Sequence, residues 1–299
     1  MAFYFPDAPD LPLPPGHRFP ATKYRLLRER CLADGLFARL GLHPAPTAGI
    51  GDLQAAHDDI YIQSVLNGTL ADEAVRRIGI PWSEILVART LASVGGSLSA
   101  ARDALNDGIA GQLAGGTHHA HRHFGSGFCV FNDLAVAALA LVGEGRVRRV
   151  SILDCDVHQG DGTAAILQGV DTVQTISVHG AKNFPFRKCA SDLDIALPDE
   201  TGDLDYMAAL DRALAAVSSF KPDILLYLSG ADALGADRLG RLALTPAGLA
   251  RRDEMVFKFS RSRGLPVSIA VGGGYAEPIS ITVDAYLETL RVAHAVYGF

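Results

Sequence analysis

The sequence has little of what defines several protein classes. Its four cysteines lie far apart, without the paired spacing of a disulfide framework or a cysteine-based zinc site. No stretch reaches the ~18 uninterrupted apolar residues that a membrane helix needs. The formal net charge of −6 offers no cluster of lysine and arginine for nucleic acid. These absences argue against a disulfide-rich secreted protein, a membrane-spanning protein and a nucleic-acid-binding protein.

The N-terminal segment lacks the basic-then-apolar pattern of a secretory signal. Residues 1–20 are instead rich in proline and include acids. We therefore expect a cytoplasmic protein with reduced thiols. The chain has 299 residues, 48% of them hydrophobic, which is ample for one large core. Because no linker, repeat or low-complexity tract divides it, we predict a single domain over residues 1–299.

The second half of the chain alternates between strand-like and helix-like segments. The strand-like runs are Val147–Leu153, Thr172–Val178, Asp223–Leu228 and Pro266–Val271. Helices are predicted for Leu204–Val217, for Pro246–Ser262 with Thr245 as N-cap, and for the alanine-rich run that follows Asn132-Asp133 and extends to Val142. Near-continuously apolar strands separated by helices predict an α/β fold whose parallel sheet is covered by helices on both faces. In such sheets, ligands bind at the carboxyl ends of the strands.

The most informative motif is Asp154-Cys155-Asp156-Val157-His158, at the end of a predicted strand. In extended chain, residues i and i+2 point to the same side, so Asp156 and His158 can reach one point. Asp232, at the end of another predicted strand, is a candidate third ligand. Two carboxylates and one imidazole would form an open, catalytic type of metal site. The alternative is that the acids bind loop amides and His158 is a packed core residue.

Two further motifs carry chemistry. Gly115-Gly116-Thr117-His118-His119 offers tandem histidines as a general base and its electrostatic partner, with Asp154 and Asp161 available to orient them. A histidine pair alone is more often a surface feature. The nearby His121 and His123 could extend a metal cluster, but we expect both to be solvated. Gly272-Gly273-Gly274-Tyr275 allows close backbone approach to a substrate, and its tyrosine could donate to a developing oxyanion.

Together these motifs resemble the histone deacetylase family, which includes acetoin-utilisation proteins and acetylpolyamine amidohydrolases. The resemblance begins near Gly16-His17 and Lys23-Tyr24, includes Ser126-Gly127-Phe128-Cys129 and Asn132-Asp133, and ends with the Gly-Gly-Gly-Tyr motif. Arg187-Lys188 and Asp192-Leu193-Asp194 are more similar to the bacterial and class IV branch than to class I. The family resemblance implies a single arginase-like α/β domain with a mostly parallel, eight-stranded sheet.

The resemblance also implies roles for individual residues. Asp156, His158 and Asp232 would hold zinc, with iron(II) as an alternative metal. His119 would be the general base and acid, His118 its electrostatic partner, and Tyr275 the group that polarises the scissile carbonyl. Asp154 would orient His118, and Asp161 would orient His119. The substrate tunnel would be formed by Phe128, Phe184, Gly127 and Gly273. A structural monovalent cation, usually potassium, would lie near Asp154, Asp156, His158, Ser177 and Val178.

The implied reaction is hydrolysis of an Nε-acyl-lysine amide, with an acetyl or a longer acyl group, in a protein or peptide. The stretch Arg77-Ile78-Gly79-Ile80-Pro81-Trp82 lacks the aspartate with which class I members grip a peptide backbone. A small-molecule amidohydrolase acting on acetylated polyamines therefore stays open, as does a catalytically silent scaffold. A dinuclear manganese ureohydrolase is disfavoured, because no bridging carboxylate accompanies Asp232.

Overall fold

A computed structural model describes residues 1–35 and 41–298. Its centre is one eight-stranded sheet in the order β2-β1-β3-β8-β7-β4-β5-β6, and every neighbouring pair is parallel. The strands are β1 (Ala2–Phe5), β2 (Gly41–Pro44), β3 (Ile109–Gln112), β4 (Val150–Asp154), β5 (Val173–Gly180), β6 (Leu193–Leu197), β7 (Ile224–Ser229) and β8 (Val267–Val271). The predicted eight-stranded, mostly parallel sheet is therefore confirmed, and the sheet is parallel throughout.

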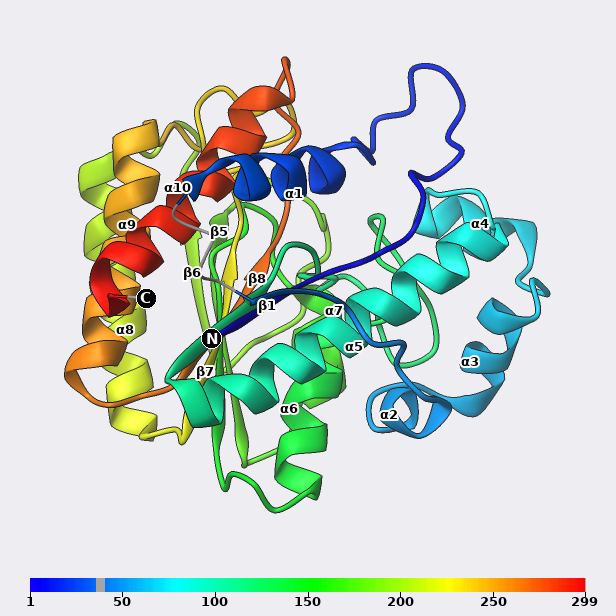
Figure 1. Cartoon of the computed structure of the whole chain (residues 1–299), viewed down its shortest axis with the longest axis horizontal. Coiled ribbons are helices and arrows are strands. Elements are labelled where there is room, and N and C mark those ends of the chain that lie inside the picture. Colours follow the sequence, from blue (N-terminus) through cyan, green and yellow to red (C-terminus); the bar gives the residue numbers. More distant parts are fainter. Residues whose placement is uncertain (36–40, 299) are drawn as a thin grey trace.

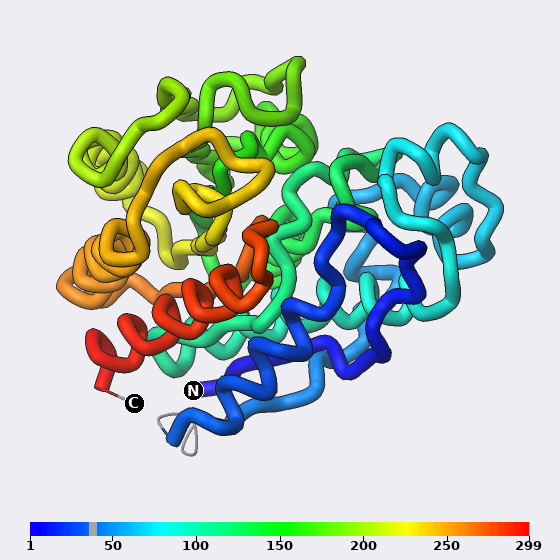
Figure 2. The backbone as a smooth tube through the Cα atoms, turned by 90° about the horizontal axis from the view of Figure 1, so that it is seen from above, coloured from blue at the N-terminus to red at the C-terminus, as the bar shows by residue number. Residues whose placement is uncertain are grey.

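Helices cover both faces of this sheet (Figure 1). One face carries α1 (Lys23–Ala33), α8 (Asp203–Phe220), α9 (Pro246–Ser262) and α10 (Ser280–Tyr297). On the other side lie α2 (Ile50–Gln54), α3 (Asp59–Leu66), α4 (Asp72–Ile78), α5 (Glu84–Asp107), α6 (Asp133–Gly143) and α7 (Asp161–Leu167). Seen from above, α1 and α10 lie side by side although they come from opposite ends of the chain (Figure 2).

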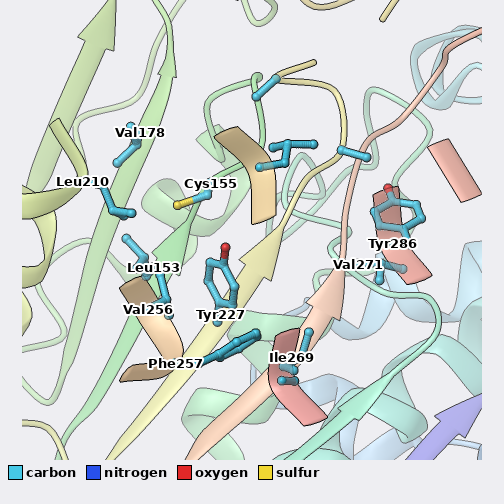
Figure 3. Packing of buried hydrophobic residues seen from close by; sticks show 14 of the residues in the cluster. Leu153, Cys155, Val178, Leu210, Tyr227, Val256, Phe257, Ile269, Val271 and Tyr286 are labelled. Carbon is cyan, nitrogen blue, oxygen red and sulfur yellow. The ribbon is translucent and has the colours of Figure 1, made fainter. Parts of the chain in front are cut away.

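The central strands are apolar at almost every position because each has two buried faces. In β7, Leu225 and Tyr227 belong to the core beneath α8 and α9, whereas Leu226 and Leu228 belong to the core beneath α5 and α6. Figure 3 shows the first of these cores, with Tyr227 beside Phe257 of α9. Because both faces of these strands are buried, polar and apolar residues do not alternate along their sequences.

The predicted caps are present in the structure. Thr245 accepts a hydrogen bond from the amide of Gly248 at the start of α9, and Asn132 accepts one from the amide of Ala135 at the start of α6. The four predicted strands correspond to β4, β5, β7 and β8, with ends that differ by up to three residues. No disulfide joins the four cysteines, and no helix of the described residues is long and apolar enough to cross a membrane.

Candidate metal centre and its cavity

The ends of two neighbouring strands bring the predicted metal ligands together. Strands β4 and β7 pair in parallel, with Asp154 opposite Leu228, so the segments that follow them leave the sheet at the same edge. Donor atoms of Asp156, His158 and Asp232 all lie within 4.8 Å of one another. The Nδ1 atom of His158 is 2.9 Å from Asp156 Oδ1 and 3.2 Å from Asp232 Oδ2. The three residues thus form one compact, buried cluster.

Backbone groups fix the two carboxylates. The amide of Gly273 donates to Asp156 Oδ2 at 2.5 Å, and the amide of Val157 donates to Asp232 Oδ1 at 2.9 Å. Behind the cluster, the buried guanidinium of Arg252 donates to the carbonyl oxygens of Gly230 and Cys155 at 2.6 and 3.4 Å. These carbonyls precede the two ligand positions, so one side chain restrains both strand ends.

The electrostatics of the cluster favour a bound cation. Asp156 and Asp232 are 1% and 0% exposed, and close buried carboxylates disfavour each other's ionised forms. Burial and the charge of Asp156 raise the pKa of Asp232 to about 7. Burial opposes protonation of His158, but the two carboxylates raise its pKa to about 10. A divalent cation would stabilise both carboxylates as anions, and two carboxylates with one imidazole are a donor set that zinc or iron(II) accepts.

The tandem histidines lie beside this cluster, each held by its own carboxylate. The Nδ1 atom of His118 is 2.6 Å from Asp154 Oδ2, and that of His119 is 2.6 Å from Asp161 Oδ1. Their ring centroids are 4.1 Å apart, and the His118 Nε2 atom is 3.9 Å from Asp156 Oδ1. The structure therefore brings together the pairs that the family resemblance implied. Because the Nδ1 atom of each ring contacts a carboxylate, Nε2 is the ring nitrogen that remains available to another partner.

The two imidazoles have opposite proton affinities. Burial lowers the pKa of both rings, but the charges of Asp154 and Asp156 outweigh it at His118 and raise its pKa to about 9. Burial and then the His118 cation lower the pKa of His119 to about 4. Neighbouring groups with pKa values pushed apart are a common feature of acid–base sites.

Asn132 and Asp133 hold the histidine segment, a role that sequence reasoning missed because it treated them only as helix caps. Asp133 accepts hydrogen bonds from the amides of Gly116 and Thr117, at 3.0 and 2.7 Å. The Asn132 amide group donates to the Ala120 carbonyl oxygen at 3.0 Å. Both side chains are fully buried. Two adjacent polar residues at the start of an apolar helix are the signal that could have indicated this role.

The Gly-Gly-Gly-Tyr segment follows β8 directly and closes the other side of the centre. The Tyr275 ring lies edge-on to His158, with centroids 6.4 Å apart. Burial, followed by the charges of Asp156 and Asp232, holds the pKa of the Tyr275 hydroxyl well above its ordinary value. The hydroxyl therefore stays protonated and can donate a hydrogen bond. A Cβ at Gly273 would lie 1.8 Å from Asp232 Oδ2, so only glycine fits there.

A cavity of about 610 Å³ connects the centre with the surface, and its wall includes His119, His158 and Tyr275. Phe128 and Phe184, the predicted tunnel walls, both line it, and Phe184 stacks edge-on against His119 at 4.8 Å. Gly127 packs against both His119 and Phe184. A Cβ at Gly127 would lie 2.6 Å from the His119 ring and 3.0 Å from Phe184. The neighbouring Phe128 has a φ of 68°, which is strained for a bulky residue. A smaller cavity of about 70 Å³ adjoins it, with Phe128 and Tyr275 in both walls, and includes Gly273 and Lys23 in its own wall.

One expectation for the histidines was wrong. His121 is not solvated: its Nε2 atom lies 3.1 Å from Asp161 Oδ2, so it shares the carboxylate that holds His119. His123 is exposed, as expected. Of the predicted monovalent-cation residues, Asp154 and Ser177 are register partners on β4 and β5, and Val178 follows on β5. In the structure the Ser177 hydroxyl lies 2.9 Å from His179 Nδ1.

Comparisons with known proteins show which family the chain resembles. The histone deacetylase domain matches residues 17–290. The chain is 43% identical, over 98% of both chains, to an uncharacterized protein of Picosynechococcus sp.. It is 28% identical to histone deacetylase 2 of Arabidopsis thaliana, over 92% of this chain and 73% of that protein, and 29% identical to histone deacetylase 1 of Homo sapiens, over 87% and 58%.

Among solved structures, the HD domain of HDA15 superposes with a TM-score of 0.78, at 23% identity, over 99% of this chain and 96% of that one. The arginase-like α/β fold implied by the motifs is therefore confirmed. The domain match spans most of the described chain and includes the metal cluster, both histidines and Tyr275. This chain belongs to the histone deacetylase family.

Proposed function

We propose that the chain is a zinc-dependent deacylase that hydrolyses the amide of Nε-acyl-lysine. The observation that carries this proposal is the convergence of three groups at the inner end of one surface-connected cavity. These groups are the Asp156–His158–Asp232 cluster, the two carboxylate-held histidines, and Tyr275, and the cavity wall includes His158, His119 and Tyr275 from them. Family membership supports an amidohydrolase in general, and this geometry supports the more specific reaction.

Asp156, His158 and Asp232 would hold the metal. When bound, the ion lowers the pKa of a coordinated water toward ~7 and polarises the substrate carbonyl. A structural potassium ion near Asp154 and Ser177 is part of the same proposal, and it would stabilise the end of β4.

The remaining chemistry belongs to the side chains of the chain. His119, fixed through Nδ1 by Asp161, takes a proton at Nε2 from the attacking water and later gives it to the leaving amine nitrogen. His118 stabilises charge beside it. The Tyr275 hydroxyl donates to the oxyanion that develops on the carbonyl oxygen. Phe128 and Phe184 flank the acyl-lysine stem and exclude water.

A substrate panel tests this function. The metal-replete protein would be given acetyl-lysine peptides, long-chain acyl-lysine peptides and acetylated polyamines, with the Tyr275→Phe variant in parallel. Turnover of acyl-lysine peptides that is lost in the variant is the expected result, and the panel also reports the acyl length. Preference for acetylated polyamines would instead indicate a small-molecule amidohydrolase, and absence of all turnover would favour a silent scaffold.

A further inference from the structure

The mouth of the cavity carries positive charge. Its lining includes Arg18, Arg77, Lys182 and Arg241, all exposed, and no carboxylate from the described part of the chain. The four cations come from four different segments: the loop before α1, the end of α4, the loop after β5 and the loop after β7. The positive charge at the mouth is therefore assembled from segments that are far apart in the sequence.

Only part of this charge is neutralised nearby. Arg77 pairs with Glu73 at 3.3 Å, and both side chains are exposed. Lys182 and Arg241 share one carboxylate, Asp199, at 3.5 and 2.8 Å. Asp237, which accepts from the amides of the lining residues Tyr275 and Leu239, is a third nearby carboxylate. Four cations against three carboxylates still leave positive charge at the mouth, in a protein whose overall net charge is −6.

Arg18 is the cation with most freedom to meet a ligand. Within residues 1–35 and 41–298, no hydrogen bond or ion pair of its side chain is found. Its neighbours nevertheless fix its backbone at the mouth. His17 Nε2 lies 2.9 Å from the carbonyl oxygen of Gly79, and the Phe19 ring packs 5.4 Å from that of Phe128. Arg18 is thus an exposed guanidinium on an anchored segment beside the tunnel wall.

We infer that the preferred substrate is an acyl-lysine whose flanking residues are acidic. This inference rests on the proposed deacylase function and names its substrate class. These cations attract acidic residues that flank the acylated lysine, and they disfavour basic peptides and cationic polyamines. A peptide suits the mouth better than a small anion does, since a single carboxylate reaches only some of the four cations, as Asp199 reaches Lys182 and Arg241. The exposed Phe186, beside Phe184 at the same mouth, adds an apolar contact for a peptide backbone or side chain.

The test uses acyl-lysine peptides that differ only in their flanking residues, which are Asp and Glu, Asn and Gln, or Lys. For the metal-replete protein, we expect kcat/KM to be about tenfold higher for the acidic peptide than for the basic one at low salt, because steering of charged ligands changes association rates by ~10–10³. The preference should shrink at 0.5 M NaCl as the charges are screened. An equal or higher kcat/KM for the basic peptide would overturn the inference.

A matched pair of variants locates the effect. Arg18→Glu should lower kcat/KM for the acidic peptide more than for the neutral peptide. Arg212→Glu makes the same charge change on the exposed surface of α8, away from the mouth, and should leave both peptides unchanged. Identical behaviour of the two variants would show that Arg18 does not act at the mouth.

Binding separates this inference from the proposed function. The same peptides, carrying a net-neutral rhodamine label, would be titrated against metal-loaded Tyr275→Phe protein and followed by fluorescence anisotropy. If the variant binds the acidic peptide more tightly but the unsubstituted protein hydrolyses none of the peptides, the charge selectivity is supported and the hydrolytic function is rejected. Turnover of all peptides without charge preference would reject the selectivity alone, and no binding and no turnover would reject both.

Discussion

The ammonium nitrogen of Lys23 lies 3.1 Å from the carbonyl oxygen of Gly272, although 249 residues separate them in the chain. It also donates to the Gly274 carbonyl oxygen at 3.4 Å and lies 5.1 Å from the centroid of the Tyr275 ring. The Lys23 side chain is 1% exposed. The first helix thus positions the loop that supplies the proposed oxyanion donor.

Replacing Lys23 by Met should loosen that loop. We expect the free energy of unfolding to fall by about 1–3 kcal/mol, because the buried carbonyl of Gly274 loses its donor and that of Gly272 keeps only the Tyr286 hydroxyl. Turnover should fall by ~10- to 100-fold with a smaller change in KM, because a shift of ~1 Å at a reacting group can cost ~10² in rate. Urea unfolding and steady-state kinetics measure the two effects. Lys258→Met, at an exposed position of α9, is the control, and equal effects of the two substitutions would contradict the positioning role.

Tyr275→Phe should remove one hydrogen-bond donor without disturbing the metal cluster. Loss of an oxyanion donor typically costs ~10²–10³ in turnover, so we expect a nearly inactive protein. Its metal content, measured by inductively coupled plasma mass spectrometry, should equal that of the unsubstituted protein. Near-normal turnover would rule out this role for the hydroxyl.

Removal of metal should destabilise the fold. The buried carboxylates of Asp156 and Asp232 repel each other without a cation between them, and a ligand at 100 times its Kd stabilises by about 2.7 kcal/mol. Chelation should therefore lower the thermal midpoint, and added zinc should restore it. The shift should vanish in Asp232→Asn and persist in Asp205→Asn, which changes an exposed residue of α8. A midpoint that does not respond to chelation would argue against a bound metal.

His57 should make stability depend on pH. The ring is 2% exposed, its Nδ1 atom lies 3.0 Å from the His121 carbonyl oxygen, and its Nε2 accepts from the Asn132 amide at 2.8 Å. Burial lowers its pKa from 6.5 to about 4. As the pH falls, His57 therefore takes up a proton in the unfolded state before it does so in the folded state. The contribution of the neutral ring to the free energy of unfolding is complete above pH 6.5 and is lost between about pH 6.5 and 4.

At about 1.4 kcal/mol per pH unit, the loss between pH 7 and pH 5 is about 2 kcal/mol. Urea unfolding at both pH values measures it, with His57→Gln as the comparison because glutamine can keep one donor and one acceptor. The variant should be less stable at pH 7 but should lose less on going to pH 5. Parallel pH profiles of the two proteins would show that another group dominates.

The sequence predicted the central part of the fold because the information there is local. The runs that became β4, β5, β7 and β8 are continuously apolar, and their helices carry cap signals such as Thr245 before Pro246. Strands β1, β2, β3 and β6 were not recognised: each has only four or five residues and becomes a strand through its neighbours in the sheet. Short segments of this kind owe their structure to tertiary pairing.

For the site, motif spacing placed the metal cluster and the histidine–carboxylate pairs, because residues that follow parallel strands meet at one edge of the sheet. It could not place Lys23 or Arg252, which contact the centre from helices distant in sequence. Motif spacing also gave the wrong prediction for His121. Its contact with the Asp161 carboxylate depends on the conformation of the loop that contains His121, which spacing does not determine. The cationic mouth was equally hidden, because its four members lie in four separate segments.

The strand order has a consequence for synthesis of the protein. Among the described strands, the group formed by β2, β1 and β3 is joined to β7, β4, β5 and β6 only through β8, the last of them in sequence. A growing chain on the ribosome can therefore form β1 to β3 and β4 to β7 only as two separate half-sheets until residues 267–271 emerge. Tyr275 follows a few residues later, so union of the halves and completion of the reaction centre are nearly the same event. A nascent or truncated chain that stops before this point has neither a continuous sheet nor the tyrosine that hydrolysis would need.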